Sequence, residues 1–259
     1  MQPPSQQTLP AADPIEEEIL GRKWFYRYQL PSGRTTQLYI PEEIARIHET
    51  RREMMLSAIA PLTRNADPAP DAIDIASHQG FFSFELARHC RHVLGLEYQA
   101  RHVESANLIK RACGYDNVDF LQENVETMPA GRYDPADIVI MFGLMYNLEN
   151  PIGVLRRACE LTKRVLLIET QTTMLDLEGP VDSGHASNTN FMHGYFGIFA
   201  GNPENIDGSA SDIVFYPSPK GLVWVLRKLG FSEVEVLEPP SGAYQQLATY
   251  KRIMVLARR

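Results

Sequence analysis

Short apolar runs alternate with amphipathic segments along the middle of the chain. The apolar runs predict strands at residues 72–76, 93–97, 117–121, 136–142 and 164–169. Between them, apolar positions recur at helical spacing, which predicts helices at residues 81–90, 100–113 and 151–162. Strands that alternate with helices form mainly parallel sheets with helices on both faces. The pattern therefore predicts an α/β fold built on a doubly wound sheet.

The C-terminal part of the pattern completes this sheet. Residues 170–216 form a long, loop-rich segment, and an expected helix at 217–229 and expected strands at 233–237 and 250–256 follow it. One helix followed by two strands supplies an antiparallel pair at the edge of a parallel sheet. We therefore expect seven strands, mostly parallel, with an antiparallel C-terminal edge.

The N-terminal region has a different pattern. Residues 1–14 are rich in Pro, Gln and Ser, and we expect them to form a disordered tail. Aromatic-rich segments at 24–30 and 31–39 predict two strands around a Ser32-Gly33 turn. Helical spacing over residues 42–59 predicts a helix that ends before Pro61.

These elements divide the chain into two parts. Residues 15–65 are expected to form an N-terminal α/β cap or lid, and residues 65–71 read as a linker by composition. Residues 72–259 form the main domain, with a lid insertion at residues 172–216.

Charge and composition exclude several classes of function. The formal net charge is -7, and the 25 basic residues are scattered along the chain, so a nucleic-acid partner is not expected. Cys90, Cys113 and Cys159 have no metal-ligand spacing, so no metal site is predicted. No apolar run is long enough to span a bilayer, and the first residues do not resemble a signal peptide. We expect a cytoplasmic protein without membrane contact; the sequence does not indicate its oligomeric state.

The first predicted βαβ unit carries the candidate chemistry. Asp74 lies in the first strand, Gly80 ends the turn after it, and Glu97 ends the second strand. In Rossmann-like folds such a unit holds an adenine nucleoside, and the acid at the end of the second strand takes the ribose hydroxyls. The unit therefore predicts a binding site for an adenosyl cofactor.

The ordered set of these residues resembles class I S-adenosylmethionine (SAM) dependent methyltransferases. Besides the βαβ unit, the resemblance rests on the segments 120–126 and 142–147. Trp24-Phe-Tyr, Leu30-Pro-Ser-Gly33 and Phe215-Tyr-Pro-Ser218 are also similar to the branch that contains the wobble-uridine tRNA-modifying enzymes, and the fold is shared with SAM-dependent azetidine-2-carboxylate synthases.

The resemblance implies a role for each matching position. The turn from Ala76 to Gly80 would lie under the amino-acid end of SAM, Glu97 would accept both ribose hydroxyls, and Asn124 would meet the adenine amino group. Phe142 and Gly143 would lie along the methionine side. The full set of expected cofactor-binding residues is Asp74, Ala76, His78, Gly80, Phe81, Phe82, Glu97, Tyr98, Asn124, Val125, Phe142 and Gly143.

Two departures from the family pattern are informative. Ser77-His78-Gln79 stands in the turn where the family has small residues. His78 either donates a hydrogen bond to the SAM carboxylate or a nearby substrate, or is a partly exposed loop histidine. Many relatives place Tyr-His after the fourth strand, whereas this chain has Tyr146-Asn147. An amide is no general base at neutral pH, so Asn147 would act by orienting a partner.

The lid insertion supplies further candidates. Residues 188–199 are rich in aromatic and amide side chains, and Tyr195 and His193 are candidate lid residues unless they only pack the insertion. We expect Tyr146, Asn147 and Tyr195 to be the catalytic residues. The segments Ser209–Asp212 and Glu169–Gln171 are candidates for polar contacts with a substrate. Trp24, Tyr26 and Tyr28 either close the other side of the site or anchor the cap.

Three classes of function remain open at this point. The leading expectation is methyl transfer from SAM to a small metabolite with an amine or hydroxyl group, in secondary metabolism. The alternative is a cyclisation in which the SAM amine attacks its own γ-carbon and gives azetidine-2-carboxylate and methylthioadenosine, with SAM as the only substrate. The third is a catalytically silent SAM-binding or tRNA-associated protein.

Overall fold

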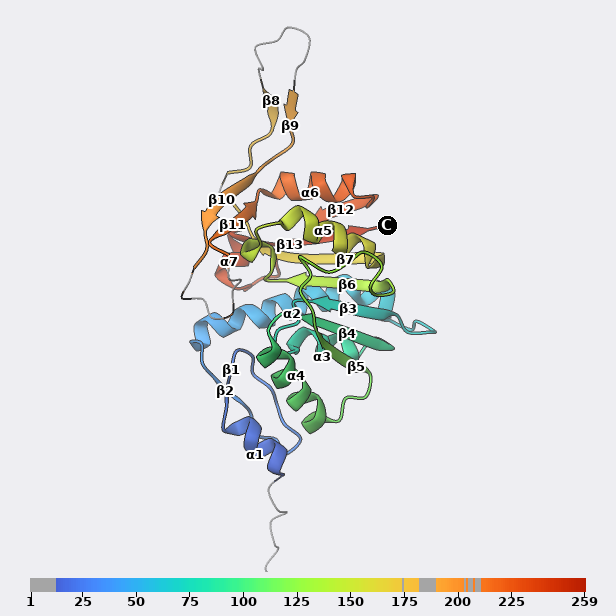
Figure 1. The fold of residues 1–259 in the computed structure, drawn as a ribbon, viewed down its shortest axis with the longest axis vertical. Coiled ribbons are helices and arrows are strands. Elements are labelled where there is room, and N and C mark those ends of the chain that lie inside the picture. The colour runs from blue at the N-terminus through green and yellow to red at the C-terminus, as the bar shows by residue number, and fades with distance from the viewer. Residues whose placement is uncertain (1–12, 174, 182–189, 203, 205–206, 208–210) are drawn as a thin grey trace, which may run out of the picture.

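A single seven-stranded sheet organises the chain (Figure 1). The computed structural model describes residues 13–173, 175–181, 190–202, 204, 207 and 211–259. The strand order is β5-β4-β3-β6-β7-β13-β12. The bounds are β3 Asp71–Ile75, β4 His92–Glu97, β5 Val118–Gln122, β6 Ala136–Phe142, β7 Thr162–Gln171, β12 Glu233–Val236 and β13 Arg252–Arg258. All neighbours from β5 to β7 pair in parallel, and β13 pairs antiparallel with β7 and with β12. The predicted fold, including its antiparallel C-terminal edge, is confirmed.

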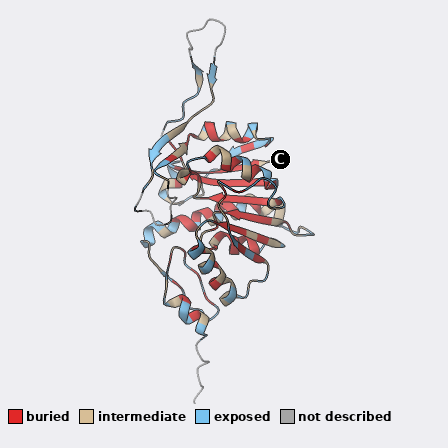
Figure 2. Cartoon of the chain, in the orientation of Figure 1, coloured by how far each residue is buried: buried red, intermediate tan, exposed pale blue. Residues whose placement is uncertain are grey.

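Helices cover both faces of this sheet because successive strand residues alternate between two apolar cores. On β6, Ile138 and Ile140 belong to one core, whereas Val139 and Met141 belong to the other. The first core is closed by α2 (Glu42–Thr63), α3 (Phe81–Ala87) and α4 (Ala100–Cys113), and the second by α5 (Pro151–Glu160) and α6 (Pro219–Lys228). Figure 2 shows the central strands almost entirely buried.

The N-terminal region differs from its prediction in detail. It contains α1 (Pro14–Leu20), the short strands β1 (Lys23–Trp24) and β2 (Gln37–Leu38), and α2. The two short strands pair in parallel, so the predicted aromatic strands do not form over their full length. The predicted Ser32-Gly33 turn is present, with an antiparallel bridge between Gln29 and Thr35 beside it. Buried aromatic side chains packed on α3 hold this segment instead.

Two expected boundaries of the N-terminal region are also corrected. Helix α2 continues through Pro61 to Thr63, although Pro61 has no backbone N–H to donate to the carbonyl of Ser57. Residues 1–12 lie outside the described part of the chain, but Asp13 accepts a hydrogen bond from the backbone N–H of Ile15 and caps α1 at Pro14. Helix α1 therefore begins within the expected tail.

The insertion after β7 contains more regular structure than its composition suggests. Strands β8 (Gly179–Val181) and β9 (Asn190–Met192) pair antiparallel, as do β10 (Phe196–Ala200) and β11 (Ile213–Pro217). The β8–β9 pair projects beyond α6 at one end of the molecule (Figure 1). A 3₁₀ turn at Met145–Asn147, labelled η1, and the short helix α7 (Gln245–Ala248) complete the fold. Among the described helices, none combines the length and apolarity needed to cross a membrane.

Candidate functional site

A cavity of about 620 Å³ opens at the carboxyl ends of the parallel strands. Ligands in doubly wound folds bind at this edge, where the strand order reverses beside β3. Eight of the twelve expected cofactor residues line the cavity: Ala76, His78, Glu97, Tyr98, Asn124, Val125, Phe142 and Gly143. Phe25 and Tyr26 of the N-terminal cap line its other side.

The turn between β3 and α3 has an unusual backbone. Ala76 has φ 61° and His78 has φ 50°, a left-handed conformation that costs a side-chain-bearing residue roughly 1–2 kcal/mol. The backbone N–H of His78 donates to Oε2 of Glu97 at 2.9 Å, and that of Ser77 donates to the Leu96 carbonyl at 3.1 Å. Strand β4 therefore holds the turn in this conformation.

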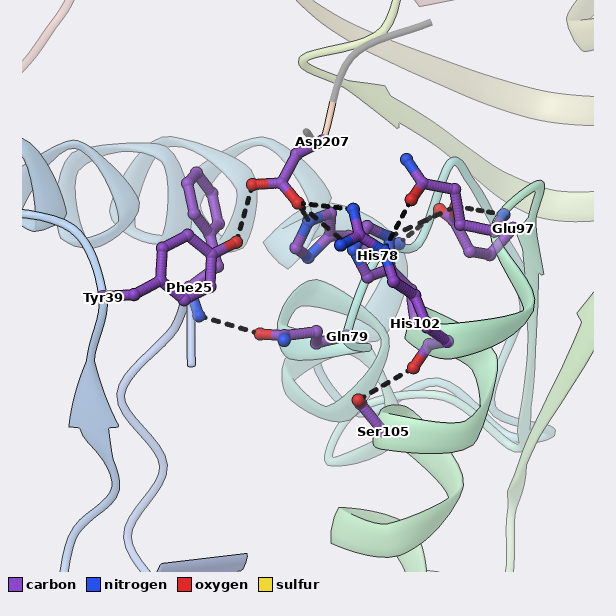
Figure 3. Close-up of polar contacts among 10 residues, drawn as sticks. Phe25, Tyr39, His78, Gln79, Glu97, His102, Ser105 and Asp207 are labelled. Carbon is purple, nitrogen blue, oxygen red and sulfur yellow. Dashed lines mark hydrogen bonds and ion pairs between the residues drawn. The ribbon is translucent and has the colours of Figure 1, made fainter. Parts of the chain in front are cut away.

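Gln79 connects the same turn to the N-terminal cap (Figure 3). Its Oε1 accepts the backbone N–H of Phe25 at 2.9 Å, and its carbonyl accepts the Tyr28 hydroxyl at 2.7 Å. Both Gln79 and Tyr28 are buried. The cap is thus fixed directly to the cofactor turn. Trp24 and Tyr28 are buried anchors of the cap and do not line the cavity, whereas Tyr26 does.

His78 belongs to a cluster with His102 of α4 and Asp207 (Figure 3). Oδ1 of Asp207 lies 3.4 Å from Nε2 of His78 and 3.2 Å from Nε2 of His102, and the Tyr39 hydroxyl donates to Oδ2 at 2.6 Å. The His78 side chain is 12% exposed and contacts the cluster, and its contact with SAM or a substrate stays a prediction. Burial lowers the pKa of His78; for His102, burial opposes protonation, but Asp207 and Glu97 raise the pKa above its ordinary value.

The three side chains of this cluster have ligand atoms within 4.8 Å of one another, a spacing compatible with a metal ion. Nη2 of Arg101, however, lies 3.3 Å from the same Asp207 oxygen, and a guanidinium there opposes a second cation. The expectation of no metal stays a prediction. His102 was not identified from the sequence, since a single histidine within a predicted helix carries no signal of its own.

Glu97 lies at the centre of the expected nucleoside site. Besides His78, its carboxylate accepts the backbone N–H of Gln99 at 2.8 Å and lies 3.5 Å from Nδ1 of His102. Burial opposes ionisation of Glu97, but His102 and the Gln99 N–H together hold its pKa below the ordinary value. Each carboxylate oxygen has a second lone pair. The two oxygens of the Glu97 carboxylate can therefore each accept a further hydrogen bond, as a ribose diol requires.

Four expected cofactor residues support the site from below. Asp74 is buried and accepts the Ser83 hydroxyl at 2.6 Å, and burial raises its pKa to about 7. A Cβ at Gly80 would lie 2.6 Å from Cζ of Phe120, and φ there is 86°. Phe81 stacks on Tyr26, and Phe82 packs edge-on against Phe142. None of these four lines the cavity, because strand β3 and helix α3 lie beneath it.

Asn124 lines the cavity, but its amide oxygen already accepts one hydrogen bond. Its amide oxygen accepts the backbone N–H of Glu126 at 3.0 Å, which closes a local turn after β5. The proposed contact with the adenine amino group stays a prediction; the oxygen has one lone pair left for it.

The opposite end of the cavity is built from charged residues of α2, β7 and β13. Oε2 of Glu169 lies 2.8 Å from Nη2 of Arg51, and Nη1 of Arg252 donates to Oε1 at 3.0 Å. Nη2 of Arg252 donates to the Tyr146 hydroxyl at 2.9 Å, and its guanidinium lies 4.6 Å from the centre of that ring. Burial raises the pKa of Glu169, but the two arginines outweigh it and hold the pKa below its ordinary value. Neither arginine was identified from the sequence, since each stands beside another basic residue, Arg52 or Lys251, and nothing local distinguishes the two.

The other expected catalytic residues have different surroundings. Asn147 lines the cavity, and its Nδ2 donates to the Gly143 carbonyl at 3.0 Å within η1. Tyr195 does not line the cavity; its backbone pairs with Ser218. His193 stacks on Trp224 with ring centres 4.8 Å apart. The packing interpretation of these two residues is favoured, and the catalytic assignment of Tyr195 stays a prediction.

The remaining segments expected to contact substrate are described in part. Ser211 lines the cavity and donates to Glu149 at 3.2 Å. Ser209 and Ala210 lie outside the described residues, as do Asn188 and Thr189 of the expected lid.

Comparison with known proteins agrees with this geometry. Residues 67–204, just over half of the 259 residues, match the methyltransferase domain family. The chain belongs to the methyltransferase domain family. The expected enzyme class and cofactor, a SAM-dependent methyltransferase of class I, are those of this family. The more specific branch stays a prediction.

Solved structures resemble this methyltransferase over most of its length. The N-terminal domain of EvdMO1, solved with S-adenosylhomocysteine (SAH) and D-fucose, is 19% identical with a TM-score of 0.66 over 91% of each chain. Magnesium protoporphyrin IX methyltransferase from Synechocystis PCC 6803, with SAH bound, is 14% identical with a TM-score of 0.55, over 85% of this chain and 88% of that one.

A curated relative matches a shorter part of the methyltransferase. The 23S rRNA (uracil(1939)-C(5))-methyltransferase RlmD of Legionella pneumophila is 29% identical over 104 residues, which are 39% of this chain. The chain spans only 23% of the length of that relative.

Proposed function

We propose that this chain transfers the methyl group of SAM to a small-molecule acceptor. The observation that carries the proposal is one continuous cavity of about 620 Å³ whose lining includes Glu97 and Asn124 as well as Tyr146 and Arg252. Its size falls in the range of small-molecule sites, which is roughly 300–1,000 Å³. Such a cavity has room for a cofactor at one end and an acceptor at the other.

The residues at the cofactor end fit SAM. Glu97 is a buried, ionised acceptor for the ribose diol, and the backbone of Gly143 approaches the cavity without a side chain. When bound there, SAM supplies an activated methyl group on a sulfonium centre. The chain's own contribution is to orient the acceptor in line with that group and to exclude water. Phe25 and Tyr26 of the cap close the cavity for this purpose.

A small acceptor is favoured over a nucleic acid. The chain has a formal net charge of -7, and Glu97, Glu123, Glu126 and Glu149 line the cavity. A phosphate backbone is bound by basic surfaces, so acids around the opening oppose it. The similarity to an rRNA methyltransferase covers 39% of this chain and 23% of that relative, too little to carry over its acceptor.

The products of SAM turnover test the proposal against its alternatives. Purified protein is incubated with SAM, with and without a panel of small amines, alcohols and carboxylic acids, and the products are identified by mass spectrometry. Formation of SAH only with an acceptor supports methyl transfer. Methylthioadenosine and azetidine-2-carboxylate from SAM alone would establish the cyclisation instead. Binding of SAM without turnover of any kind would support the third class, a catalytically silent SAM-binding protein.

A further inference from the structure

The acceptor end of the cavity contains a buried excess of positive charge. Arg51 and Arg252 are 5% and 7% exposed, and Glu169, which is fully buried, contacts both. In the part of the chain that the structure describes, no second carboxylate lies within ion-pair distance of either guanidinium. Two cations therefore share one anion.

The hydrogen-bonding groups of the two arginines are used unequally. Each of the three nitrogens of Arg252 donates to a neighbour: Nε to Gln246, Nη1 to Glu169 and Nη2 to Tyr146. Arg51 contacts Glu169 through Nη2, but its buried Nε–H has no hydrogen-bond partner. Arg51 lines the cavity. A buried charged donor without a partner is costly, and this one is available to a ligand in the cavity.

The surroundings of Arg51 indicate a positive local potential. His48 lies one turn before Arg51 on α2, is 4% exposed, and has no partner for either ring nitrogen. Burial, followed by the charge of Arg51, lowers the pKa of His48 well below its ordinary value. The acids that line the cavity come from other places: Glu97 from the end of β4, Glu123 and Glu126 from the segment after β5, Glu149 from the segment after η1, and Asp207 from the insertion.

The positive end is remote from the nucleoside end. Arg252 lies on β13 and Glu97 on β4, four neighbours apart in the sheet order. Adjacent strands are spaced about 4.8 Å apart, so the two positions are separated by roughly 19 Å. An adenosine moiety held by Glu97 would therefore lie far from Arg252. The carboxylates that could reach the arginines are that of the acceptor and that at the methionine end of SAM.

We propose that Arg51 and Arg252 form a subsite for a carboxylate of the acceptor, with Arg51 Nε–H and the Tyr146 hydroxyl as the donors that the ligand meets. This inference rests on the proposed function, and it narrows the acceptor to a small carboxylic acid. A carboxylate matches the fork of a guanidinium and neutralises the excess charge.

Matched ligand pairs test the subsite without knowledge of the true acceptor. Acetate and acetamide, benzoate and benzamide, and naphthoate and naphthamide are titrated calorimetrically into the SAH-loaded protein. At least one carboxylate is expected to bind about 10- to 100-fold more tightly than its amide, as for a charged hydrogen bond. Equal binding, or no binding, of all carboxylates overturns the proposal, and so does tighter binding of phenyl phosphate than of benzoate.

Two neighbouring arginines provide a matched pair of variants. Arg51→Met leaves Glu169 and Arg252 as a neutral pair and is expected to abolish the preference for carboxylate over amide. Arg52→Met changes the adjacent, half-exposed arginine, which pairs with Glu85 outside the cavity, and is expected to leave the preference intact. If Arg51→Met does not fold, Arg51→Lys is used and is expected to keep a reduced preference. A preference that persists in both Arg51 variants overturns the proposal.

A titration with two cofactors distinguishes a carboxylate of the acceptor from the carboxylate of SAM itself. SAM and decarboxylated SAM are titrated into the wild type and Arg51→Met. Similar affinities of each cofactor for both proteins support the acceptor assignment. A loss for SAM alone in Arg51→Met would assign the arginines to the carboxylate of the cofactor and overturn the proposal. Failure of methyl transfer is seen separately, as the absence of SAH formation from SAM with any acceptor.

Discussion

The backbone N–H of His78 donates to the carboxylate of Glu97 at 2.9 Å. This contact joins the turn after the first core strand to the end of the second, and it holds a histidine where φ is 50°. The family pattern has small residues in this turn, whose backbone needs no such support. In this chain the acid that is expected to bind the ribose therefore also stabilises the turn between β3 and α3.

Glu97→Gln is expected to weaken SAM binding. The substitution keeps the shape of the side chain but removes the charge that accepts hydrogen bonds from His78, Gln99 and the ribose. Each charged hydrogen bond contributes roughly 1.5–3 kcal/mol, so the dissociation constant is expected to rise about 10- to 100-fold or more. Isothermal titration calorimetry with SAM measures the change. Asp119→Asn on the neighbouring strand, with an exposed side chain, is the control. Unchanged affinity for Glu97→Gln would remove Glu97 from the cofactor site.

Asp74 is expected to make stability fall as pH rises. Burial raises its pKa from 3.8 to about 7, so the folded state binds a proton that the unfolded state has already lost between these values. The stabilising contribution is present in full below pH 4 and is lost as pH rises towards 7, by at most roughly 4 kcal/mol at 1.36 kcal/mol per pKa unit.

Asp74→Asn tests this dependence. The amide remains neutral and its oxygen still accepts the Ser83 hydroxyl. Urea unfolding of the wild type at pH 5 and pH 8 is compared with that of Asp74→Asn and of the exposed Asp116→Asn. We expect the fall in unfolding free energy from pH 5 to pH 8 to be smaller in Asp74→Asn than in the other two proteins. If the unfolding free energy falls equally in all three proteins, a titrating group other than Asp74 causes the pH dependence.

Tyr28→Phe is expected to loosen the cap over the cofactor turn. The change leaves the buried carbonyl of Gln79 without its partner, which costs about 1–3 kcal/mol. Denaturant unfolding measures the loss, and the half-exposed Tyr250→Phe serves as the control. Equal stability of the two variants would show that the Tyr28 hydroxyl does not hold the cap.

Tyr146→Phe is expected to lower turnover more than binding. The hydroxyl accepts from Arg252 and has its own hydrogen directed to no described partner, so it is available to the acceptor. A tenfold or greater fall in kcat corresponds to about 1.4 kcal/mol of lost transition-state stabilisation. SAM affinity should stay within about threefold of the wild-type value, which is under 0.7 kcal/mol. Tyr216→Phe, a neighbouring ring 5.9 Å away, is the control. A wild-type kcat for Tyr146→Phe would exclude the hydroxyl from the reaction.

Asn147→Ala separates orientation from simple support of the 3₁₀ turn. Loss of the hydrogen bond to the Gly143 carbonyl is expected to cost about 1 kcal/mol of stability. We expect turnover to fall with little loss of SAM affinity, because Tyr146 is adjacent in the same turn. If kcat and affinity both match the wild type while stability falls, Asn147 is a structural residue only.

The core elements were predictable because local pattern and burial agree there. Helix α4 and strand β6 begin and end at the predicted residues, since amphipathic spacing and a continuous apolar run are strong signals. The turn of the N-terminal hairpin was predicted correctly, but its strands were predicted too long, and Tyr26 and Tyr28 are held by ring packing on α3. In the insertion, pairing between strands far apart in sequence formed β10 and β11 without a strong local signal.

The sequence by itself determined the sheet, the cofactor class and the position of Glu97, because a βαβ unit fixes these within a short stretch of chain. The tertiary structure alone decided what surrounds them. Arg51 and Arg252 lie 201 positions apart in sequence and meet only because both ion-pair with Glu169. Local periodicity indicates which face of an element is buried. It does not indicate which charged residues of distant elements will pair, because that depends on how the elements pack together.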